Sequence, residues 1–228
     1  MANQPTIPQR FSVIDENNRD QYAFLNQHDE CYYIWERMSQ LWSGHEQPDY
    51  QNIPATNQLI SNFQIPVTCK TSQPKRYYWK EQAIKHAAKA LSQLIPENWR
   101  EHATFVPIPP SKVKDHNEHD PRLRLTLQAV RPRLKDLREL VLQHDNADAK
   151  RKGVSPTDRA QNYYINEEVT NPKPSTIFIV DDVLTTGCHY KAIELILNNQ
   201  FPDTPIFGLF LARAVRPPQD NEDILAFL

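Results

Sequence analysis

The segment Thr176–Val180 constrains the fold of this chain more than any other. Its residues are apolar or β-branched, which is typical of a strand buried on both faces of a sheet. Two carboxylates, Asp181 and Asp182, follow directly, and Cys188–Leu197 then has the apolar spacing of an amphipathic helix. A buried strand that passes through a short turn into a helix is the repeating unit of parallel α/β sheets. The sequence therefore predicts an α/β fold.

Other segments continue this alternation of helices and strands. Apolar residues at helical spacing predict a helix that ends before Pro96, and a short apolar strand is expected at Thr104–Ile108. Asp120 and Pro121 have the pattern of an N-cap followed by proline at the first helical position. Further elements are expected at Glu139–Gln143 (a strand), Ser155–Tyr164 (a short helix) and Ile206–Ala212 (a strand). Together they predict a mostly parallel central sheet flanked by helices.

Residues 1–75 lack this alternation and form a predicted N-terminal segment. They are rich in Pro, Gln, Asn, Tyr and Trp, and one helix is expected over Tyr22–Trp42. Over Ser43–Pro74 the repeated prolines predict a mostly irregular chain. We therefore expect two parts, an appended segment at residues 1–75 and an α/β domain at residues 76–228.

Composition and charge narrow the class of protein. Hydrophobic residues make up 39% of the chain and charged residues 24%, with a formal net charge of −2, so a globular chain that does not coat nucleic acid is expected. No signal-peptide pattern and no apolar stretch long enough to cross a bilayer is present. Three separated cysteines form neither a disulfide framework nor a C-x-x-C pair. We therefore expect a cytoplasmic protein with free thiols and no membrane partner.

Glycine is scarce, and this limits how a phosphate could be bound. The chain has four glycines, at positions 44, 153, 187 and 208, too far apart for a G-x-G-x-x-G or Walker A loop. Thr185, Thr186 and Gly187 nevertheless predict a tight turn into the helix that follows. Backbone N–H groups at a helix N-terminus, together with two hydroxyls, make a compact anion cradle that needs one glycine. A phosphate-binding turn is therefore predicted at Gly187.

The carboxylates beside this turn predict a second kind of ligand group. Asp181 and Asp182 would repel a phosphate, so their natural partners are the hydroxyls of a sugar or a hard cation such as Mg²⁺. A phosphate cradle next to paired hydroxyl acceptors describes a sugar phosphate. The alternative is an ordinary turn at the end of a strand, in which Thr185 and Thr186 cap the following helix.

The string Ile177–Gly187 resembles the signature with which type I phosphoribosyltransferases bind 5-phosphoribosyl-1-pyrophosphate (PRPP). The resemblance implies a Rossmann-like phosphoribosyltransferase fold in which Asp181 and Asp182 are catalytic residues that contact the ribose hydroxyls and hold Mg²⁺ indirectly. It also implies that the 5′-phosphate is bound by the residues that follow, Val183, Leu184, Thr185, Thr186 and Gly187.

Two further strings extend the resemblance, which is strongest to the ComF-type branch of that family. Phe105–Lys112 is similar to the loop that binds pyrophosphate, and the residues implied in this contact are Pro109, Pro110, Ser111 and Lys112. Ser155–Asn162 is similar to a ComF-type pattern in which Arg159 and Asn162 recur. The alternative for Phe105–Lys112 is a proline turn on the protein surface.

The chemistry of PRPP indicates which cations to expect. Loss of pyrophosphate from the anomeric carbon builds negative charge on the leaving group, which Mg²⁺ and cationic side chains stabilise. Candidates besides Lys112 are Arg122, whose place in the first turn of a helix opposes the helix dipole, and Lys152 at the end of a basic run. That run, Lys150–Lys152, either closes over the site or is a solvated basic stretch.

The expected function is transfer of the phosphoribosyl group from Mg-PRPP to an acceptor that the sequence does not identify, with release of pyrophosphate. The alternative is a non-catalytic protein that senses PRPP or a nucleoside monophosphate, as a regulator or as an accessory subunit in a bacterial competence or phage-defence system. Residues 1–75 are candidates for a hood over the acceptor, a homodimer contact or a partner-docking segment. A transition-metal site at His116 and His119 is not expected, because no second ligand cluster has suitable spacing.

Overall fold

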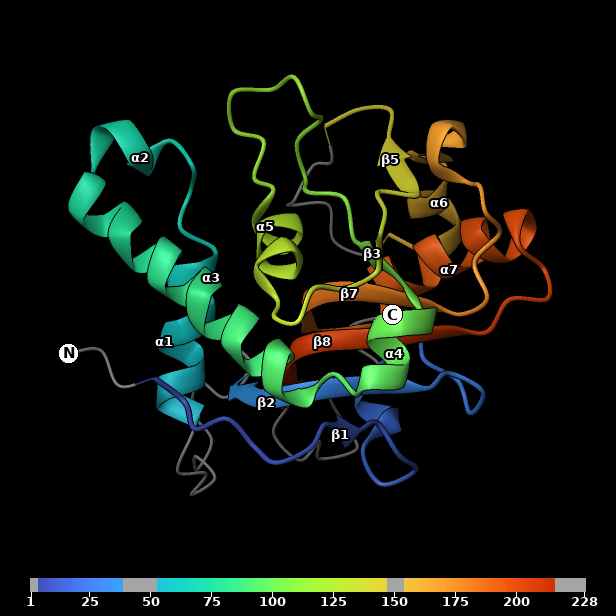
Figure 1. Cartoon of the computed structure of the whole chain (residues 1–228), viewed down its shortest axis with the longest axis horizontal. Helices are drawn as coiled ribbons and strands as arrows, with labels where there is room; N and C mark the ends of the chain where they lie inside the picture. Colours follow the sequence, from blue (N-terminus) through green and yellow to red (C-terminus); the bar gives the residue numbers. More distant parts are fainter. Residues whose placement is uncertain (1–3, 39–52, 147–153, 216–228) are drawn as a thin grey trace.

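The structure is a computed structural model that describes residues 4–38, 53–146 and 154–215 (Figure 1). A six-stranded sheet with the order β1-β2-β8-β7-β3-β4 forms its centre. All neighbouring strands are parallel except β1 and β2. The predicted α/β class with a mostly parallel central sheet is therefore confirmed. The strands span Ser12–Val13 (β1), Cys31–Met38 (β2), Thr104–Pro107 (β3), Asp136–Leu137 (β4), Ile177–Leu184 (β7) and Ile206–Val215 (β8).

Helices flank this sheet. The helix α3 packs against both α1 and α5, whereas α7 packs against β7 and α6. A separate antiparallel ribbon of β5 (Val141–Gln143) and β6 (Tyr163–Ile165) lies beside α6 and α7 (Figure 1). The helices span Arg19–Gln21 (η1), Ile53–Phe63 (α1), Cys69–Ser72 (α2), Pro74–Leu94 (α3), Glu97–His102 (α4), Arg122–Ala129 (α5), Pro156–Ala160 (α6), Glu167–Val169 (η3) and Cys188–Gln200 (α7).

The central strands are covered on both faces. Ile177–Val180 of β7 and Leu209–Ala212 of β8 are at most 1% exposed. The ring of Phe178 contacts those of Phe105 on β3 and Phe207 on β8, with centroids 5.5 and 5.3 Å apart. Burial of apolar surface is the main favourable term in folding, and close packing leaves these strands little freedom to move. The ends of β3 and β7 are thereby held in fixed positions.

The helix expected over Tyr22–Trp42 is wrong for the described residues, which do not include Trp42. Cys31–Met38 form the strand β2 instead, and Cys31 pairs with Gly208 of β8. The buried residues of β2 are Cys31, Tyr33, Ile34 and Trp35. A strand covered on both faces has apolar residues at successive positions, so it also satisfies a helical spacing. Pairing with a distant strand decides between the two structures.

The irregular chain expected over Ser43–Pro74 is also wrong where the structure describes it. Residues 53–63 form α1 and residues 69–72 form α2. Pro54 lies in the first turn of α1 and Pro74 is the first residue of α3. At these positions a missing N–H and a fixed φ are compatible with a helix. These two prolines mark helix starts.

The helix predicted before Pro96 and the strand predicted near Thr104 are confirmed as α3 and β3. Ser155 caps α6 as expected, since its hydroxyl accepts a hydrogen bond from a backbone N–H of that helix. The helix α6 ends at Ala160 rather than at Tyr164, because the following residues pair with β5 and form β6.

Residues from the segment 1–75 contribute directly to the central sheet. The strands β1 and β2 occupy one edge of the sheet, and α1 packs against β2 and α3. This part of the chain therefore shares a core with the predicted α/β domain, while a hood or docking role stays a prediction. Within the described ranges, no helix has both the length and the apolarity needed to cross a membrane.

Candidate functional site

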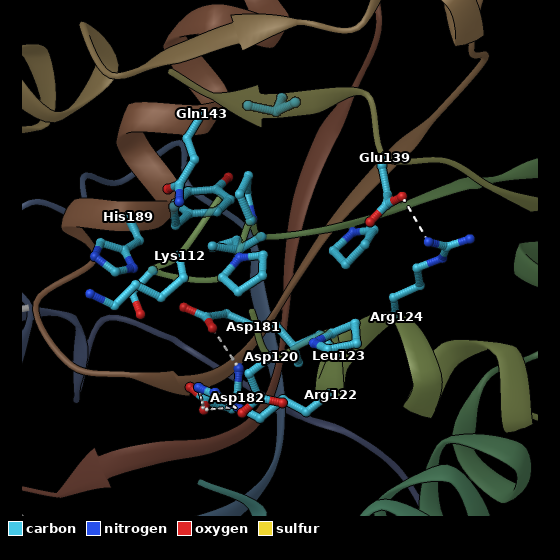
Figure 2. Close-up of a pocket in the computed structure, with 18 of the residues that line it drawn as sticks. Lys112, Asp120, Arg122, Leu123, Arg124, Glu139, Gln143, Asp181, Asp182 and His189 are labelled. Atoms are coloured by element: carbon cyan, nitrogen blue, oxygen red, sulfur yellow. Dashed lines mark hydrogen bonds and ion pairs between the residues drawn. The ribbon is translucent and has the colours of Figure 1, made fainter. Parts of the chain in front are cut away.

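A cavity of about 770 Å³ lies where β3 and β7 end at the edge of the sheet (Figure 2). In open α/β sheets this edge is the usual place for a ligand, and the volume suits a small organic molecule. Nearly all of the predicted site residues line it: Pro109, Pro110, Ser111, Lys112, Arg122, Arg159, Asp181, Asp182, Val183, Leu184, Thr185, Thr186 and Gly187. Three segments far apart in the sequence therefore meet in one cavity.

Two predicted residues stand outside this group. Asn162 does not line the cavity in the described part of the chain; its side chain bonds to the backbone of Asp145 through both its oxygen and its nitrogen, each at 3.0 Å. It therefore closes the end of the β5–β6 ribbon. Lys152, with the basic run to which it belongs, lies outside the described residues.

The predicted phosphate-binding turn joins β7 to α7. Gly187 has φ +83°, a left-handed conformation that favours glycine. A Cβ atom at Gly187 would also lie only 2.8 Å from Cδ2 of Leu25. Thr186 Oγ1 accepts a hydrogen bond from the N–H of Cys188 at 3.3 Å, but the N-cap residue of α7 is Gly187, so Thr186 is not the helix cap considered as the alternative. The turn lines the cavity at the N-terminus of a 13-residue helix, where the helix dipole favours an anion.

Val183 and Leu184 lie in the strand rather than in the turn. The strand β7 continues to Leu184, and both residues still pair with β8. Leu184 is 1% exposed, and its apolar side chain belongs to the core. The groups available to a phosphate at this end of the cavity are therefore those of the turn itself.

The two neighbouring carboxylates have unequal surroundings. Asp182 Oδ2 accepts hydrogen bonds from Nε and Nη2 of Arg122 at 3.2 and 2.8 Å and from Nε2 of Gln64 at 2.9 Å. Asp181 Oδ1 accepts a hydrogen bond from the backbone N–H of Asp182 at 2.7 Å. Figure 2 shows Asp181 directed toward the side of the cavity that holds Lys112, whereas Asp182 lies beside Arg122. Asp181 is therefore the member of the pair that faces a ligand.

The surroundings also shift the pKa values of Asp181 and Asp182 in opposite directions. Burial raises the pKa of Asp181 well above its usual range, and the adjacent negative charge of Asp182 adds to this effect. Burial likewise opposes ionisation of Asp182, but the Arg122 guanidinium and the Gln64 amide outweigh it, so the pKa of Asp182 is lowered. When the pair carries a single proton, these surroundings favour it on Asp181 rather than on Asp182.

Arg122 belongs to a buried chain of charges that reaches away from the cavity. Its Nη1 donates to Asp120 Oδ2 at 2.9 Å, and Lys80 Nζ donates to the same oxygen at 2.7 Å. Lys80 is 1% exposed and also donates to the carbonyl of Phe63 at 2.8 Å. The N-cap predicted at Asp120 is wrong, because Pro121 occupies the cap position. The Asp120 carboxylate instead pairs with buried Lys80 and partly buried Arg122. Charge pairing takes precedence over capping here because unpaired buried charges are costly.

The loop after β3 places the side chain of Lys112 in the wall of the cavity. The N–H of Ile108 donates to the carbonyl of Val180 at 2.9 Å, which ties the start of the loop to β7. The Lys112 side chain is 32% exposed, and its nearest described carboxylate is Glu118 at 4.0 Å. A pair this long and this exposed contributes little, so the ammonium of Lys112 is available to an anionic ligand.

The cavity is also lined by residues outside the predicted site, among them Gln143, His189 and Arg37. Gln143 on β5 is 8% exposed, and neither Nε2 nor Oε1 has a hydrogen-bond partner among the described residues. His189 follows the phosphate turn, and its side chain is exposed at the cavity. Arg37 comes from β2. Tertiary packing brings Gln143 and Arg37 to the cavity, and neither lies in a sequence pattern typical of a site. His189 is different, because its place two residues after Gly187 puts it beside the predicted turn.

The described residues contain no group of three or more His, Cys, Asp or Glu side chains arranged to hold a metal ion alone. Magnesium, however, commonly binds through one or two carboxylates together with phosphate oxygens of a substrate and water. Asp181 faces the cavity and fits this pattern once it has lost its proton. The residues present therefore suit Mg²⁺ that arrives with a phosphate ligand.

No family model matches this chain, and no curated protein matches it. Membership of the phosphoribosyltransferase family therefore stays a prediction. It rests on the strings Ile177–Gly187, Phe105–Lys112 and Ser155–Asn162.

Proposed function

We propose that this protein binds Mg-PRPP in the cavity and transfers its 5-phosphoribosyl group to an acceptor, with release of pyrophosphate. One observation carries the proposal: the turn at Gly187, the carboxyl of Asp181 and the ammonium of Lys112 line a single cavity. These groups match, in order, a phosphate, a sugar hydroxyl and a second phosphate-type anion.

The order of the strands supports this assignment. β3 and β7 are adjacent and parallel, so the segments that follow them begin about 5 Å apart at the same edge of the sheet. The 5′-phosphate would lie on the turn before α7, the ribose over Asp181, and the pyrophosphate against the loop that contains Lys112. When bound, Mg²⁺ would neutralise charge on the pyrophosphate, and Asp181 is the residue placed to hold it.

In the proposed transfer, the bond from the ribose to pyrophosphate breaks as the bond to the acceptor forms. A lone pair on the acceptor forms a bond to C1 of the ribose while the bond from C1 to the pyrophosphate oxygen breaks. The electron pair of that bond leaves on the pyrophosphate, and the proton of the attacking group passes to solvent. Lys112 would stabilise the charge that develops on the leaving group, and the turn at Gly187 would fix the ribose in place.

The test is direct binding of PRPP. Isothermal titration calorimetry with Mg²⁺ and PRPP is expected to show saturable binding, which Asp181→Asn and Lys112→Ala each weaken roughly tenfold or more. Asp203→Asn is the matched control, because Asp203 is an exposed carboxylate in the turn before β8, away from the cavity. Absence of binding to the unsubstituted protein, or equal binding in all variants, would refute the proposal.

Turnover is measured separately as release of pyrophosphate in the presence of acceptors. Release that depends on both PRPP and an acceptor is expected from a transferase. Tight PRPP binding without release on any acceptor would instead favour a protein that senses PRPP, since the same cavity would serve both roles.

A further inference from the structure

The strand order indicates from which side an acceptor would approach, given the proposed function. The ribose would lie over the end of β7 and the leaving group beside β3, so displacement at C1 requires the nucleophile on the opposite side. Next to β7 on that side comes β8, and next to β8 comes β2. The cavity wall formed there includes Phe210 from β8, Arg37 from β2 and Gln64, which follows α1.

Arg37 is the cation of this wall. It is half-buried near the carboxyl end of β2, where it pairs with Ala214 of β8. Its guanidinium interacts electrostatically with the carboxylate of Asp182. Among the described residues, however, Arg37 forms no side-chain hydrogen bond and no ion pair. Asp182 already accepts hydrogen bonds from Arg122 and Gln64, so it is not the dedicated counterion of Arg37.

Two arginines on α5, Arg122 and Arg124, also line the cavity but differ from Arg37 in this respect. Arg122 is paired with Asp120 and Asp182, at 2.9 and 2.8 Å, and Arg124 is paired with Glu139 at 3.2 Å. A guanidinium that is partly withdrawn from water and has no hydrogen-bonded counterion loses hydration, and the charge of Asp182 offsets only part of that loss. Burial lowers the pKa of Arg37, which reflects this loss. An anionic group on a bound ligand would supply the counterion that the guanidinium of Arg37 lacks among the described residues.

We propose that Arg37 binds a negatively charged group of the acceptor, so that the acceptor is an anionic molecule carrying a carboxylate or a phosphate. A guanidinium recognises both groups through two parallel hydrogen bonds, which fixes the orientation of the ligand as well as its charge. The N-terminal segment would then supply a specificity-determining residue through β2. This inference rests on the proposed function, because it takes the ribose and the pyrophosphate as already placed.

The test compares matched pairs of probes that differ only in charge. Ligand-observed NMR measures binding of benzoate and benzamide, nicotinate and nicotinamide, and phenyl phosphate and phenol to the full chain loaded with Mg²⁺ and PRPP. The charged members are expected to bind better to the unsubstituted protein. In Arg37→Gln this preference falls roughly 10- to 100-fold, and in Arg37→Lys it is partly restored. The carboxylate and phosphate arms show which anion is preferred.

Arg124→Gln is the matched control, since it removes a guanidinium of the same cavity that is already paired with Glu139. PRPP affinity, measured by calorimetry in every variant, is expected to stay within about twofold in Arg37→Gln. Equal binding of charged and neutral probes, or a preference unchanged in Arg37→Gln, overturns this inference while PRPP binding stands. Failure of the unsubstituted protein to bind PRPP overturns the proposed function as well, so the two failures are distinguishable.

Discussion

Arg122 on α5 donates two hydrogen bonds to a single oxygen of Asp182 on β7, at 3.2 and 2.8 Å. The two residues are 60 positions apart in the chain. Because Arg122 also binds Asp120, one guanidinium compensates two carboxylates at the floor of the cavity. The contact makes Asp182 a structural anchor and leaves Asp181 to face the ligand.

The first prediction concerns the stability that this contact supplies. Arg122→Met leaves two largely buried carboxylates without their shared cation, which lowers the free energy of unfolding at pH 7 by about 3 kcal/mol. Urea denaturation followed by circular dichroism measures the change. The control is Arg124→Met, since Arg124 is 42% exposed in its pair with Glu139 and should lose less than about 1 kcal/mol. Equal losses in the two variants would contradict the anchoring role of Arg122.

The second prediction concerns the dependence of stability on pH. The pKa of Asp181 is raised in the folded state, so the unfolded chain loses this proton first as the pH rises from acid. As the pH rises from the pKa of Asp181 in the unfolded state to its pKa in the folded state, the free energy of unfolding falls progressively. The full loss of stability is present above the folded-state pKa. Asp181→Asn removes this cost, and the variant is therefore expected to be more stable than the unsubstituted protein at neutral pH but not at pH 3.

The pKa of Asp182 is shifted in the opposite direction to that of Asp181, so the Asp182→Asn variant is the control. The pKa of Asp182 is lowered in the folded state, so the contribution of this carboxylate to stability is present above the unfolded pKa and is lost as the pH falls through the folded pKa. Asp182→Asn should therefore destabilise the protein at neutral pH. Denaturation curves collected from pH 3 to pH 8 test both variants, and the same direction of change in both would argue against the separation of the pair.

The third prediction concerns the turn before α7. Gly187→Ala places a Cβ in a left-handed conformation and 2.8 Å from Leu25, and it should cost about 1–3 kcal/mol of stability. Leu25→Ala in the same chain removes the close contact but not the backbone strain. The added Gly187→Ala change should therefore cost less in the Leu25→Ala background, by thermal denaturation, but not become neutral. Full recovery would show that φ at this position is not constrained.

The fourth prediction concerns the unpartnered amide of Gln143. Gln143→Leu replaces two buried polar atoms with apolar ones of similar size, and it should raise the free energy of unfolding by about 1 kcal/mol. If the amide is kept for a ligand, the same variant should also bind Mg-PRPP more weakly. Gln64→Leu is the comparison, because Gln64 donates to Asp182 and its loss should lower stability instead. A Gln143 variant that is less stable would show that the amide has a structural partner.

Much of the fold follows from local patterns, and the exceptions share one cause. The apolar run of β7 and the cap at Ser155 act through their own residues and neighbours, so the sequence alone predicts them. Local spacing predicts a helix where β2 forms, because the partner of β2, the strand β8, lies near the other end of the described chain. Local spacing does not report such a pairing, and tertiary contacts override local preference.

The features of the site also fall into those set by local sequence and those set by tertiary contacts. By itself, the sequence determined that two carboxylates and a one-glycine turn would follow a buried strand, because backbone propensity and helix-end chemistry act within a few residues. Tertiary contacts, in contrast, bind Asp182 to Arg122, raise the pKa of Asp181 and place Arg37 of β2 at the cavity. These outcomes depend on burial and on charges brought together from distant segments, and both arise only when the sheet is assembled.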